Sequence, residues 1–231
     1  ILIDTGEQDN TIVEYLLDRR VKKIDYIMLS HFDSDHTAKT IEIIENLKVK
    51  NIIISKQAER SNEFENIIKK AQENKINVIL VKAGDIVRID KDTYFEILWP
   101  QNDNIIAENA LNNNSIVAKM YHKNFSILFT GDIEEKAEVK IVEKYQENLK
   151  ASVLKVPHHG SSTSSTKEFI QMVKPQISLI GAGQKNKFGH PSIKTIETLE
   201  SYGSTIYRTD LHGEITLVID KKGEVKIDTH V

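Results

Sequence analysis

The residues best suited to chemistry lie in one short stretch, residues 30–36 (SHFDSDH), which holds two imidazoles and two carboxylates. The apolar run at residues 24–29 just before it is typical of a buried strand. Imidazole nitrogens and carboxylate oxygens are common ligands of divalent metals in proteins. The pattern therefore predicts a metal site where a strand ends at a sheet edge, with the candidate ligands His31, Asp33, Asp35 and His36.

Four further segments place polar groups after an apolar run, three of them directly and the fourth after a short loop. Together with the first stretch they hold five of the eight histidines. In open sheets, ligands bind beyond the strand ends, where such loops converge. Two cations ~3.5–4 Å apart can share a bridging carboxylate, and Asp132 suits that role because Gly131 permits a close backbone approach. The segments are Asp4-Thr5-Gly6, Thr130-Gly131-Asp132, Pro157-His158-His159-Gly160-Ser161 and Gly189-His190-Pro191.

Plainer interpretations of these residues remain open beside the metal site. Aspartates in residues 31–36 can cap a helix, although capping needs only one of them, and a calcium-binding EF-hand loop is excluded by the missing glycine and glutamate. Asp4 is expected to support the metal loop by hydrogen bonding rather than to bind metal itself. Asp132 can instead cap a helix that begins near residue 133. His158 and His159 can each be a ligand, a general acid, a phosphate contact or part of a structural turn.

Most of the chain alternates strand-like and helix-like segments, which predicts one layered α/β domain over residues 1–231. The chain opens at Ile1, within a strand-like segment, so the first strand is expected to be truncated. Residues 121–125 are expected to form a hairpin turn. Strands are predicted at 24–29, 51–55, 76–81, 94–99, 115–121, 125–130, 151–156, 176–181, 204–207 and 214–219. Helices are predicted at 10–20, 38–48, 60–74, 133–147, 165–174 and 192–202.

Composition excludes several classes of protein. The absence of cysteine rules out disulfides, thiolate metal sites and cysteine nucleophiles. A formal net charge of −3 means that any binding of nucleic acid must depend on a local basic patch. No apolar run is long enough to span a bilayer, so the sequence predicts no transmembrane segment in this chain.

Taken in order, the five motifs resemble the metallo-β-lactamase superfamily, and within it the ComEC/Rec2 branch, whose hydrolase-like domain is attached to a DNA-uptake channel. The resemblance covers nearly the whole chain. It implies a four-layer αββα sandwich, with two mixed β-sheets flanked by helices, and hydrolysis by a metal-bound hydroxide. It also implies the ligands: Asp35, His36 and His190 for one metal, His31 and Asp33 for the other, and Asp132 as the bridge.

The chain departs from the usual superfamily pattern in several places, two of which concern metal ligands. Asp33 stands where a histidine is usual, and this shift toward oxygen ligands makes Mn²⁺ or Mg²⁺ plausible beside Zn²⁺. The region 112–117 contains no histidine where the superfamily has a further ligand, as in the ComEC branch. We therefore expect one or two divalent metal ions, Mn²⁺ or Zn²⁺.

The sequence thus predicts a metal-dependent hydrolase, a phosphodiesterase or nuclease acting on DNA in an uptake system. The catalytic residues are expected to be Asp35 with His158 or His159 as the general acid. The loop that holds Lys185, Lys187 and Phe188 can grip phosphate and stack a base, or it can be a plain solvated loop. The predicted substrate contacts are Ser115, Lys155, Ser161, Lys185 and Lys187.

Two alternatives to the nuclease remain. One is a hydrolase of small phosphoesters of the phosphocholine type, which the mild negative charge favours. The other is a non-catalytic module that guides nucleic acid and keeps a vestigial metal site. If the chain belongs to a ComEC-type protein, it is expected to be a soluble domain in the cytoplasm or tethered at the outer face of a membrane, beside a membrane channel domain.

Overall fold

The computed structural model describes residues 1–9, 11–220 and 223–230. These residues form two compact units. Unit 1 comprises residues 1–83 and 100–116, and unit 2 comprises residues 84–99 and 117–231. Among the described residues, no helix combines the length and the apolar character needed to cross a bilayer.

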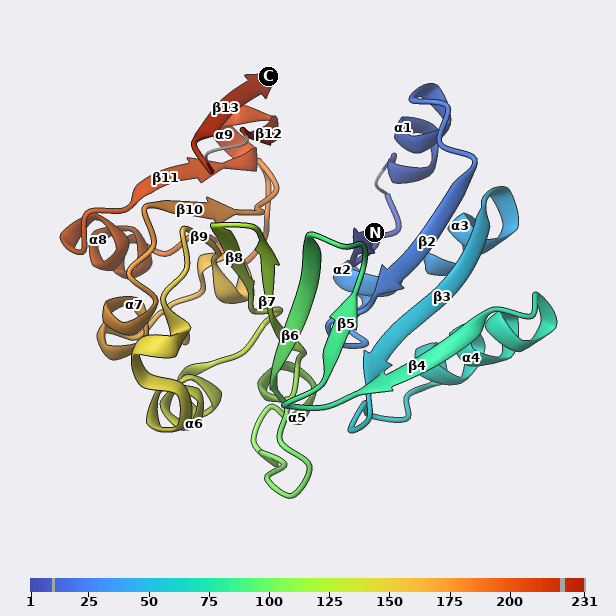
Figure 1. Ribbon diagram of the computed structural model, residues 1–231, viewed down its shortest axis with the longest axis horizontal. Coiled ribbons are helices and arrows are strands. Elements are labelled where there is room, and N and C mark those ends of the chain that lie inside the picture. The colour runs from blue at the N-terminus through green and yellow to red at the C-terminus, as the bar shows by residue number, and fades with distance from the viewer. Residues whose placement is uncertain (10, 221–222, 231) are drawn as a thin grey trace. The chain divides into compact units, whose positions relative to one another are not determined.

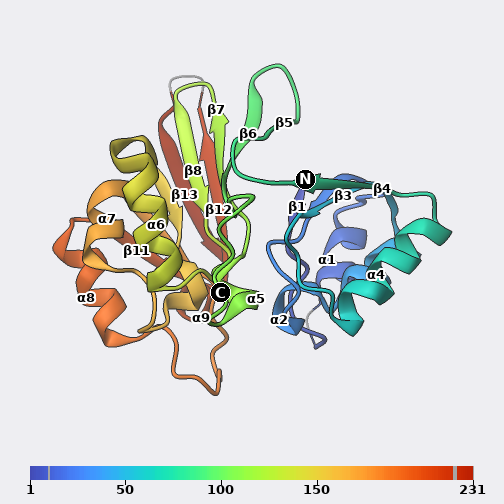
Figure 2. The same cartoon turned by 90° about the horizontal axis from the view of Figure 1, so that it is seen from below.

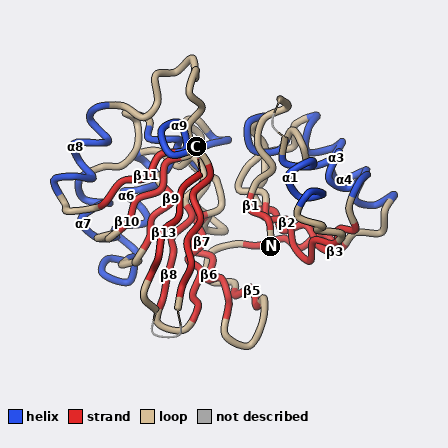
Figure 3. Tube along the Cα trace, turned by 90° about the horizontal axis from the view of Figure 1, so that it is seen from above, coloured by secondary structure: helices blue, strands red, loops and turns tan. Residues whose placement is uncertain are grey.

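Unit 1 is built on a parallel sheet whose four described strands follow one another in chain order (Figure 1). Helices join successive strands, and crossovers of this kind keep neighbouring strands parallel. Figure 3 shows α1, α3 and α4 on one side of this sheet. The strands are β1 (Leu2–Ile3), β2 (Lys23–Met28), β3 (Lys48–Ser55) and β4 (Asn77–Val81), and the helices are α1 (Ile12–Asp18), α2 (Ser34–Thr37), α3 (Thr40–Asn46), α4 (Asn62–Glu73) and α5 (Ala110–Asn113).

Apolar side chains on the strands and on one stripe of each helix form the core of unit 1. Ile27 and Ile52, on β2 and β3, are fully buried, as is Ile67 on α4. The start of α4 is fixed by Ser61, whose hydroxyl accepts a hydrogen bond from the Phe64 amide (3.1 Å). Full burial of such a side chain stabilises the fold by roughly 1.5–3 kcal/mol, so this core holds the sheet edge that carries the predicted metal ligands.

Unit 2 contains a mixed sheet in the order β11-β10-β9-β8-β7-β6-β5, in which β5 to β8 pair antiparallel and β8 to β11 pair parallel. Figure 2 shows α6, α7 and α8 on one side of it. The strands are β5 (Ile86–Arg88), β6 (Thr93–Trp99), β7 (Val117–His122), β8 (Phe125–Phe129), β9 (Val153–Lys155), β10 (Ile177–Ile180) and β11 (Thr205–Arg208). The helices are α6 (Glu135–Tyr145), α7 (Lys167–Val173), α8 (Ile193–Ser201) and α9 (Thr209–His212), with the 3₁₀ helices η1 (Gln146–Leu149) and η2 (Pro157–Gly160).

A separate antiparallel hairpin, β12 (Glu214–Ile219) with β13 (Val225–His230), adds an apolar surface to unit 2. Leu217 and Ile219 from β12 pack against Phe125 and Ile127 of β8. This packing buries side chains of the mixed sheet near its centre. The hairpin thus supports β8, the strand that leads to Asp132.

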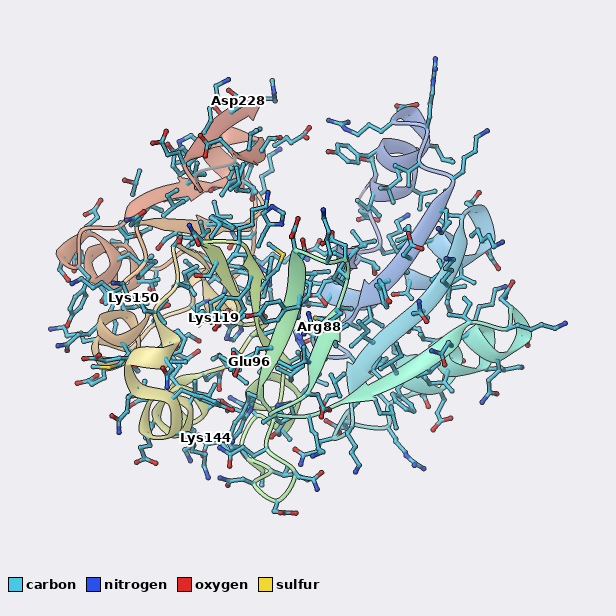
Figure 4. The ribbon with its side chains drawn as sticks, viewed as in Figure 1. Arg88, Glu96, Lys119, Lys144, Lys150 and Asp228 are labelled. Atoms are coloured by element: carbon cyan, nitrogen blue, oxygen red, sulfur yellow. The ribbon has the colours of Figure 1, made fainter. Side chains whose placement is uncertain are left out.

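The mixed sheet also carries one nearly buried cation, Lys119 on β7, opposite Glu96 on β6 (Figure 4). Burial lowers the pKa of Lys119, and the facing Glu96 partly offsets that effect. The ammonium group donates to the carbonyl of Asn148 (2.8 Å), so it retains a hydrogen bond inside the protein. This contact ties the antiparallel half of the sheet to η1.

The structure agrees with the predicted elements and differs in the pairing of one sheet. The predicted hairpin at residues 121–125 joins β7 to β8, with Lys123 in the left-handed region (φ 53°) that such turns need. The sequence predicted two mixed sheets. Unit 2 contains one, whereas the described strands of unit 1 all run parallel because helical crossovers connect them. The prediction of one domain over residues 1–231 stays a prediction.

Candidate metal centre

In unit 1, the predicted ligand loop lies beside Asp4 because β1 and β2 are parallel neighbours that end at the same edge. The two carboxylate oxygens of Asp4 accept hydrogen bonds from the Ser30 amide (2.7 Å) and the Ser30 hydroxyl (2.8 Å). The second of these oxygens also lies 2.8 Å from Nδ1 of His36. Asp4 therefore fixes the start of the loop and the ring of its last histidine.

These contacts set the orientation of both histidine rings. Nδ1 of His36 carries the proton that Asp4 accepts, so Nε2 is its lone-pair nitrogen. The Ser30 hydroxyl donates to Asp4, which leaves its oxygen to accept from Nδ1 of His31 (3.0 Å). The two rings lie 4.2 Å apart between centroids, and Nε2 of His36 lies 3.8 Å from Oδ2 of Asp35.

The contacts with His36 and with the Ser30 amide also stabilise the negative charge of the Asp4 carboxylate. Burial raises the pKa of the Asp4 carboxyl, but the interaction and hydrogen bond with His36 and the bond from the Ser30 amide outweigh burial. The net result is a pKa below the ordinary aspartate value, so Asp4 stays ionised and can hold the Nδ1 proton of His36.

Asp33 has a structural role that the sequence offered as an alternative. It is the N-cap of α2, and its Oδ1 accepts a hydrogen bond from the Ser34 amide (2.7 Å). This cap turns the chain so that Asp35 and His36 follow within one short helix. Metal binding by Asp33 stays a prediction.

In unit 2, the turn after β8 places Asp132 next to the loop after β9. Thr130 is buried, and its hydroxyl donates to the carbonyl of Lys155 at the end of β9 (2.8 Å). Gly131 adopts a positive φ of 52°, and its carbonyl accepts from the His158 amide (3.2 Å). Asp132 is 3% exposed, so a buried carboxylate lies at this strand end.

His159 is oriented in the same manner as His36. Its Nδ1 donates to the carbonyl of Gly181, in the loop after β10 (2.7 Å), and its Nε2 faces Oδ2 of Asp132 at 3.4 Å. The sequence left the role of His159 open, and the structure places it directly beside the predicted bridging carboxylate.

The donor atoms in each unit fit a divalent metal. Metal–ligand bonds of ~2.0–2.2 Å at tetrahedral angles separate neighbouring ligand atoms by roughly 3.4 Å. The imidazole–carboxylate distances are 3.8 Å for His36 with Asp35 and 3.4 Å for His159 with Asp132. Both exceed a hydrogen bond and match the edge of a coordination shell.

His158 has a set of partners that the sequence did not suggest. Its Nδ1 faces the carboxylate of Glu134 (3.5 Å) and the hydroxyl of Thr163 (3.4 Å), and that hydroxyl donates to the same carboxylate (3.1 Å). Ser161, a predicted substrate contact, is 4% exposed and hydrogen-bonds Thr163 (3.0 Å). Glu134 follows Asp132 by two positions, and this spacing is the local signal in the sequence that points to it.

His190 completes the histidine cluster of unit 2. Its ring centroid lies 5.7 Å from that of His158. Burial lowers the pKa of His190, the nearby His158 and His159 lower it further, and Asp132 acts in the opposite sense. The loops also touch closely, since a Cβ on Gly160 would lie 2.6 Å from Cβ of Pro191. Only glycine fits there.

The remaining predicted substrate contacts lie in different surroundings. Lys185 and Lys187 are exposed, in the loop after β10. Lys155 is half-buried, and its ammonium donates to the Val156 carbonyl (3.2 Å). Ser115 is fully buried in unit 1. Its role as a substrate contact stays a prediction.

The sequence profile of the metallo-beta-lactamase superfamily matches residues 1–183. This match covers well over half of the 231 residues, and the chain therefore belongs to that superfamily. The expected metallo-β-lactamase fold, α/β with sheets flanked by helices, is confirmed.

Two curated relatives are competence proteins, which confirms the resemblance to the ComEC/Rec2 branch. ComE operon protein 3 of Bacillus subtilis (strain 168) is 32% identical over 207 residues, 90% of this chain and 26% of that protein. Competence protein ComA of Neisseria gonorrhoeae is 33% identical over 129 residues, 56% of this chain and 18% of that protein. The chain thus spans about a quarter of the first relative and less of the second.

Among solved structures, the chain is similar to CmlA, a diiron β-hydroxylase from Streptomyces venezuelae. The TM-score is 0.54 at 12% identity, over 81% of this chain and 44% of that chain. At this identity the likeness shows a shared fold.

Proposed function

We propose that this chain is a metal-dependent phosphodiesterase that cleaves DNA. The observation that carries the proposal is the repeated pairing of an imidazole Nε2 with a carboxylate at the strand ends of each unit, His36 with Asp35 and His159 with Asp132. In each pair, a protein acceptor holds Nδ1 and so points Nε2 toward the carboxylate, the arrangement in which histidine binds metal.

The proposed ligands of one or two Mn²⁺ or Zn²⁺ ions are those expected from the sequence, with His159 added. When bound, such ions lower the pKa of water and polarise phosphoryl oxygens. The chain's own groups orient the donor atoms. Asp4 holds the ring of His36, and the Gly181 carbonyl holds the ring of His159. The full set is His31, Asp33, Asp35, His36, Asp132, His159 and His190.

His158 is the proposed general acid for the leaving oxygen. Its Nδ1 faces Glu134 and Thr163, so Nε2 is the atom that can exchange a proton with substrate. Its side chain is about a fifth exposed, at 21%, which allows access from solvent. Glu134, buried behind it, keeps the ring in one orientation.

DNA is the proposed substrate because the relatives are competence proteins and because exposed cations flank the histidine cluster of unit 2. With only Lys155, Lys185 and Lys187 in place, few phosphates can be held. Affinity for single strands should then fall with salt with a slope of about −2 on a double-logarithmic plot. The alternative, a hydrolase of small phosphoesters, is supported by the mild negative net charge of −3, which does not favour binding of a long polyanion.

The test is digestion of labelled single-stranded DNA beside bis-p-nitrophenyl phosphate, with added Mn²⁺ or Zn²⁺. Asp35→Asn keeps the size of the side chain and should abolish turnover of both. Asp103→Asn, an exposed position in the same unit, should retain turnover. Turnover of the small ester alone would overturn the nuclease proposal and favour the small-phosphoester alternative. Binding of DNA without turnover of either substrate would favour the guiding module.

A further inference from the structure

The loop after β10 exposes an aromatic ring beside the histidine cluster of unit 2. Phe188 is 81% exposed, the highest value among the large apolar side chains of the described residues. One face of its ring stacks on His190, with 5.8 Å between centroids and planes 17° apart. The exposure leaves the other face open to solvent. Folding normally buries phenyl rings, so this one requires an explanation.

The backbone around Phe188 is held in place by hydrogen bonds from one side chain. Nδ2 of Asn186 donates to the carbonyls of Gly183 and His190, each at 2.8 Å. Oδ1 of Asn186 accepts from the His190 amide, also at 2.8 Å. The two bonds between Asn186 and His190 close this segment into a small loop with Phe188 at its middle, and the bond to Gly183 fixes the residues before it. The ring is therefore presented to solvent by an ordered turn.

We propose that the open face of Phe188 is a stacking platform for a nucleobase of single-stranded nucleic acid, next to the phosphodiester that is cleaved. The inference rests on the proposed function and deepens it by naming the class of substrate. Two exposed cations, Lys185 and Lys187, belong to the same loop and suit the flanking phosphates. A ring paired with cations is the combination by which proteins bind single strands without reading sequence.

Single strands fit this platform better than duplexes or small esters. Bases in a duplex already stack on one another, so none is available for the ring without unpairing. A phosphocholine-type ester has no planar group to stack, and the rings of bis-p-nitrophenyl phosphate are attached to the scissile phosphate itself rather than to a neighbouring nucleotide. His190 covers the inner face of the Phe188 ring, so the ring presents one fixed face to a base.

The experiment compares Phe188→Ala with Ile193→Ala, a control side chain of similar exposure (78%) at the start of α8. Phe188→Ala should raise KM for a single-stranded oligonucleotide roughly 5- to 150-fold, the factor equivalent to about 1–3 kcal/mol per stacked base. It should leave kcat/KM for bis-p-nitrophenyl phosphate within about twofold, and Phe188→Trp should retain oligonucleotide turnover. Ile193→Ala should change neither substrate.

A binding measurement separates this inference from the proposed catalysis. Fluorescence anisotropy of a labelled oligonucleotide, recorded in a chelator, should show the same loss of affinity for Phe188→Ala. An oligonucleotide with abasic sites should bind the wild type as weakly as it binds the variant. Binding that depends on Phe188 without any turnover would reject the catalytic proposal and leave the platform standing.

Three results would overturn the platform. Wild-type and Phe188→Ala proteins that cleave or bind the oligonucleotide equally well would show that the ring is not used. Equal losses on the oligonucleotide and the small ester would show that Phe188 only shields His190. No binding of the oligonucleotide by the wild type would reject the platform together with the nuclease.

Discussion

Glu138 of α6 makes the stability of unit 2 depend on pH in the opposite direction to most carboxylates. The residue is fully buried, and its two oxygens accept hydrogen bonds from the amides of Ser165 (2.6 Å) and Thr166 (2.8 Å). Those amides lie just before α7, on the segment that continues from the histidine loop. Glu138 thus anchors the backbone that follows His158 and His159.

Burial is the largest influence and raises the pKa of Glu138 from 4.5 to about 7, although both amides act against it and Glu135 adds to it. The folded protein therefore binds this proton more tightly than the unfolded chain. The stability that the neutral acid contributes is complete below pH 4.5 and is lost as pH rises to about 7. The difference corresponds to roughly 3 kcal/mol.

The perturbation that tests this is Glu138→Gln, which keeps the shape and removes the titration. Glutamine has one acceptor and turns an NH₂ group toward the second amide, which costs about 1–2 kcal/mol at any pH. The variant should therefore be less stable than the wild type at pH 5 by that amount. At pH 8, where the wild type has lost roughly 3 kcal/mol, the variant should be the more stable protein by about 1–2 kcal/mol.

Urea unfolding followed by circular dichroism, in a chelator at pH 5, 6, 7 and 8, measures both proteins. Metal ligands titrate equally in each, so the difference between them isolates Glu138. Glu143→Gln, an exposed position on the same helix, should follow the wild type throughout. A difference between Glu138→Gln and the wild type that stays constant from pH 5 to pH 8 would refute the reasoning.

Three further predictions concern His158 and two groups that orient histidines, Asp4 and Glu134. Asp4→Asn should weaken Mn²⁺ or Zn²⁺ binding by about 10- to 100-fold, because a neutral amide accepts the Nδ1 proton of His36 less strongly than a carboxylate. Calorimetric titration measures the affinity, and an unchanged value would reject the role of Asp4. His158→Ala should slow cleavage of DNA by roughly 10²–10⁴ and affect bis-p-nitrophenyl phosphate far less, since nitrophenolate leaves without an acid. Glu134→Gln should reproduce that substrate dependence at about a tenth of the wild-type rate on DNA, and equal losses on both substrates would exclude the general-acid assignment.

Long elements of the fold were predictable because their periodicity is strong over many residues. Helix α4 was expected at residues 60–74 and spans Asn62–Glu73, and β7 with β8 follow the predicted hairpin. Short elements carry too few residues for any period. Strand β5, helix α2 and the 3₁₀ helix η2, of three to four residues each, were therefore missed.

Candidate ligands were predictable for a different reason, since residues 30–36 concentrate several ligand types in one turn. Their partners were not. Glu134 and Thr163 lie 29 positions apart and meet only because β8 and β9 are parallel neighbours with adjacent ends. In the sequence, nothing distinguishes Asn186 from the other polar residues of its loop. Its three hydrogen bonds could not be predicted because they depend on how the loop folds back on itself.

The histidine loop of unit 2 holds its donors by strained backbone rather than by a regular element. His158 and His159 both adopt positive φ, at 50° and 51°, a region that costs a non-glycine residue of order 1–3 kcal/mol. The Gly131 carbonyl fixes the first of them, the Gly181 carbonyl fixes the ring of the second, and Glu138 anchors the residues that follow. A relaxed turn would spread these two rings and separate His159 from Asp132. Because these three contacts come from neighbouring strand ends and from α6, the orientation of the donors depends on the packing of unit 2 around the loop.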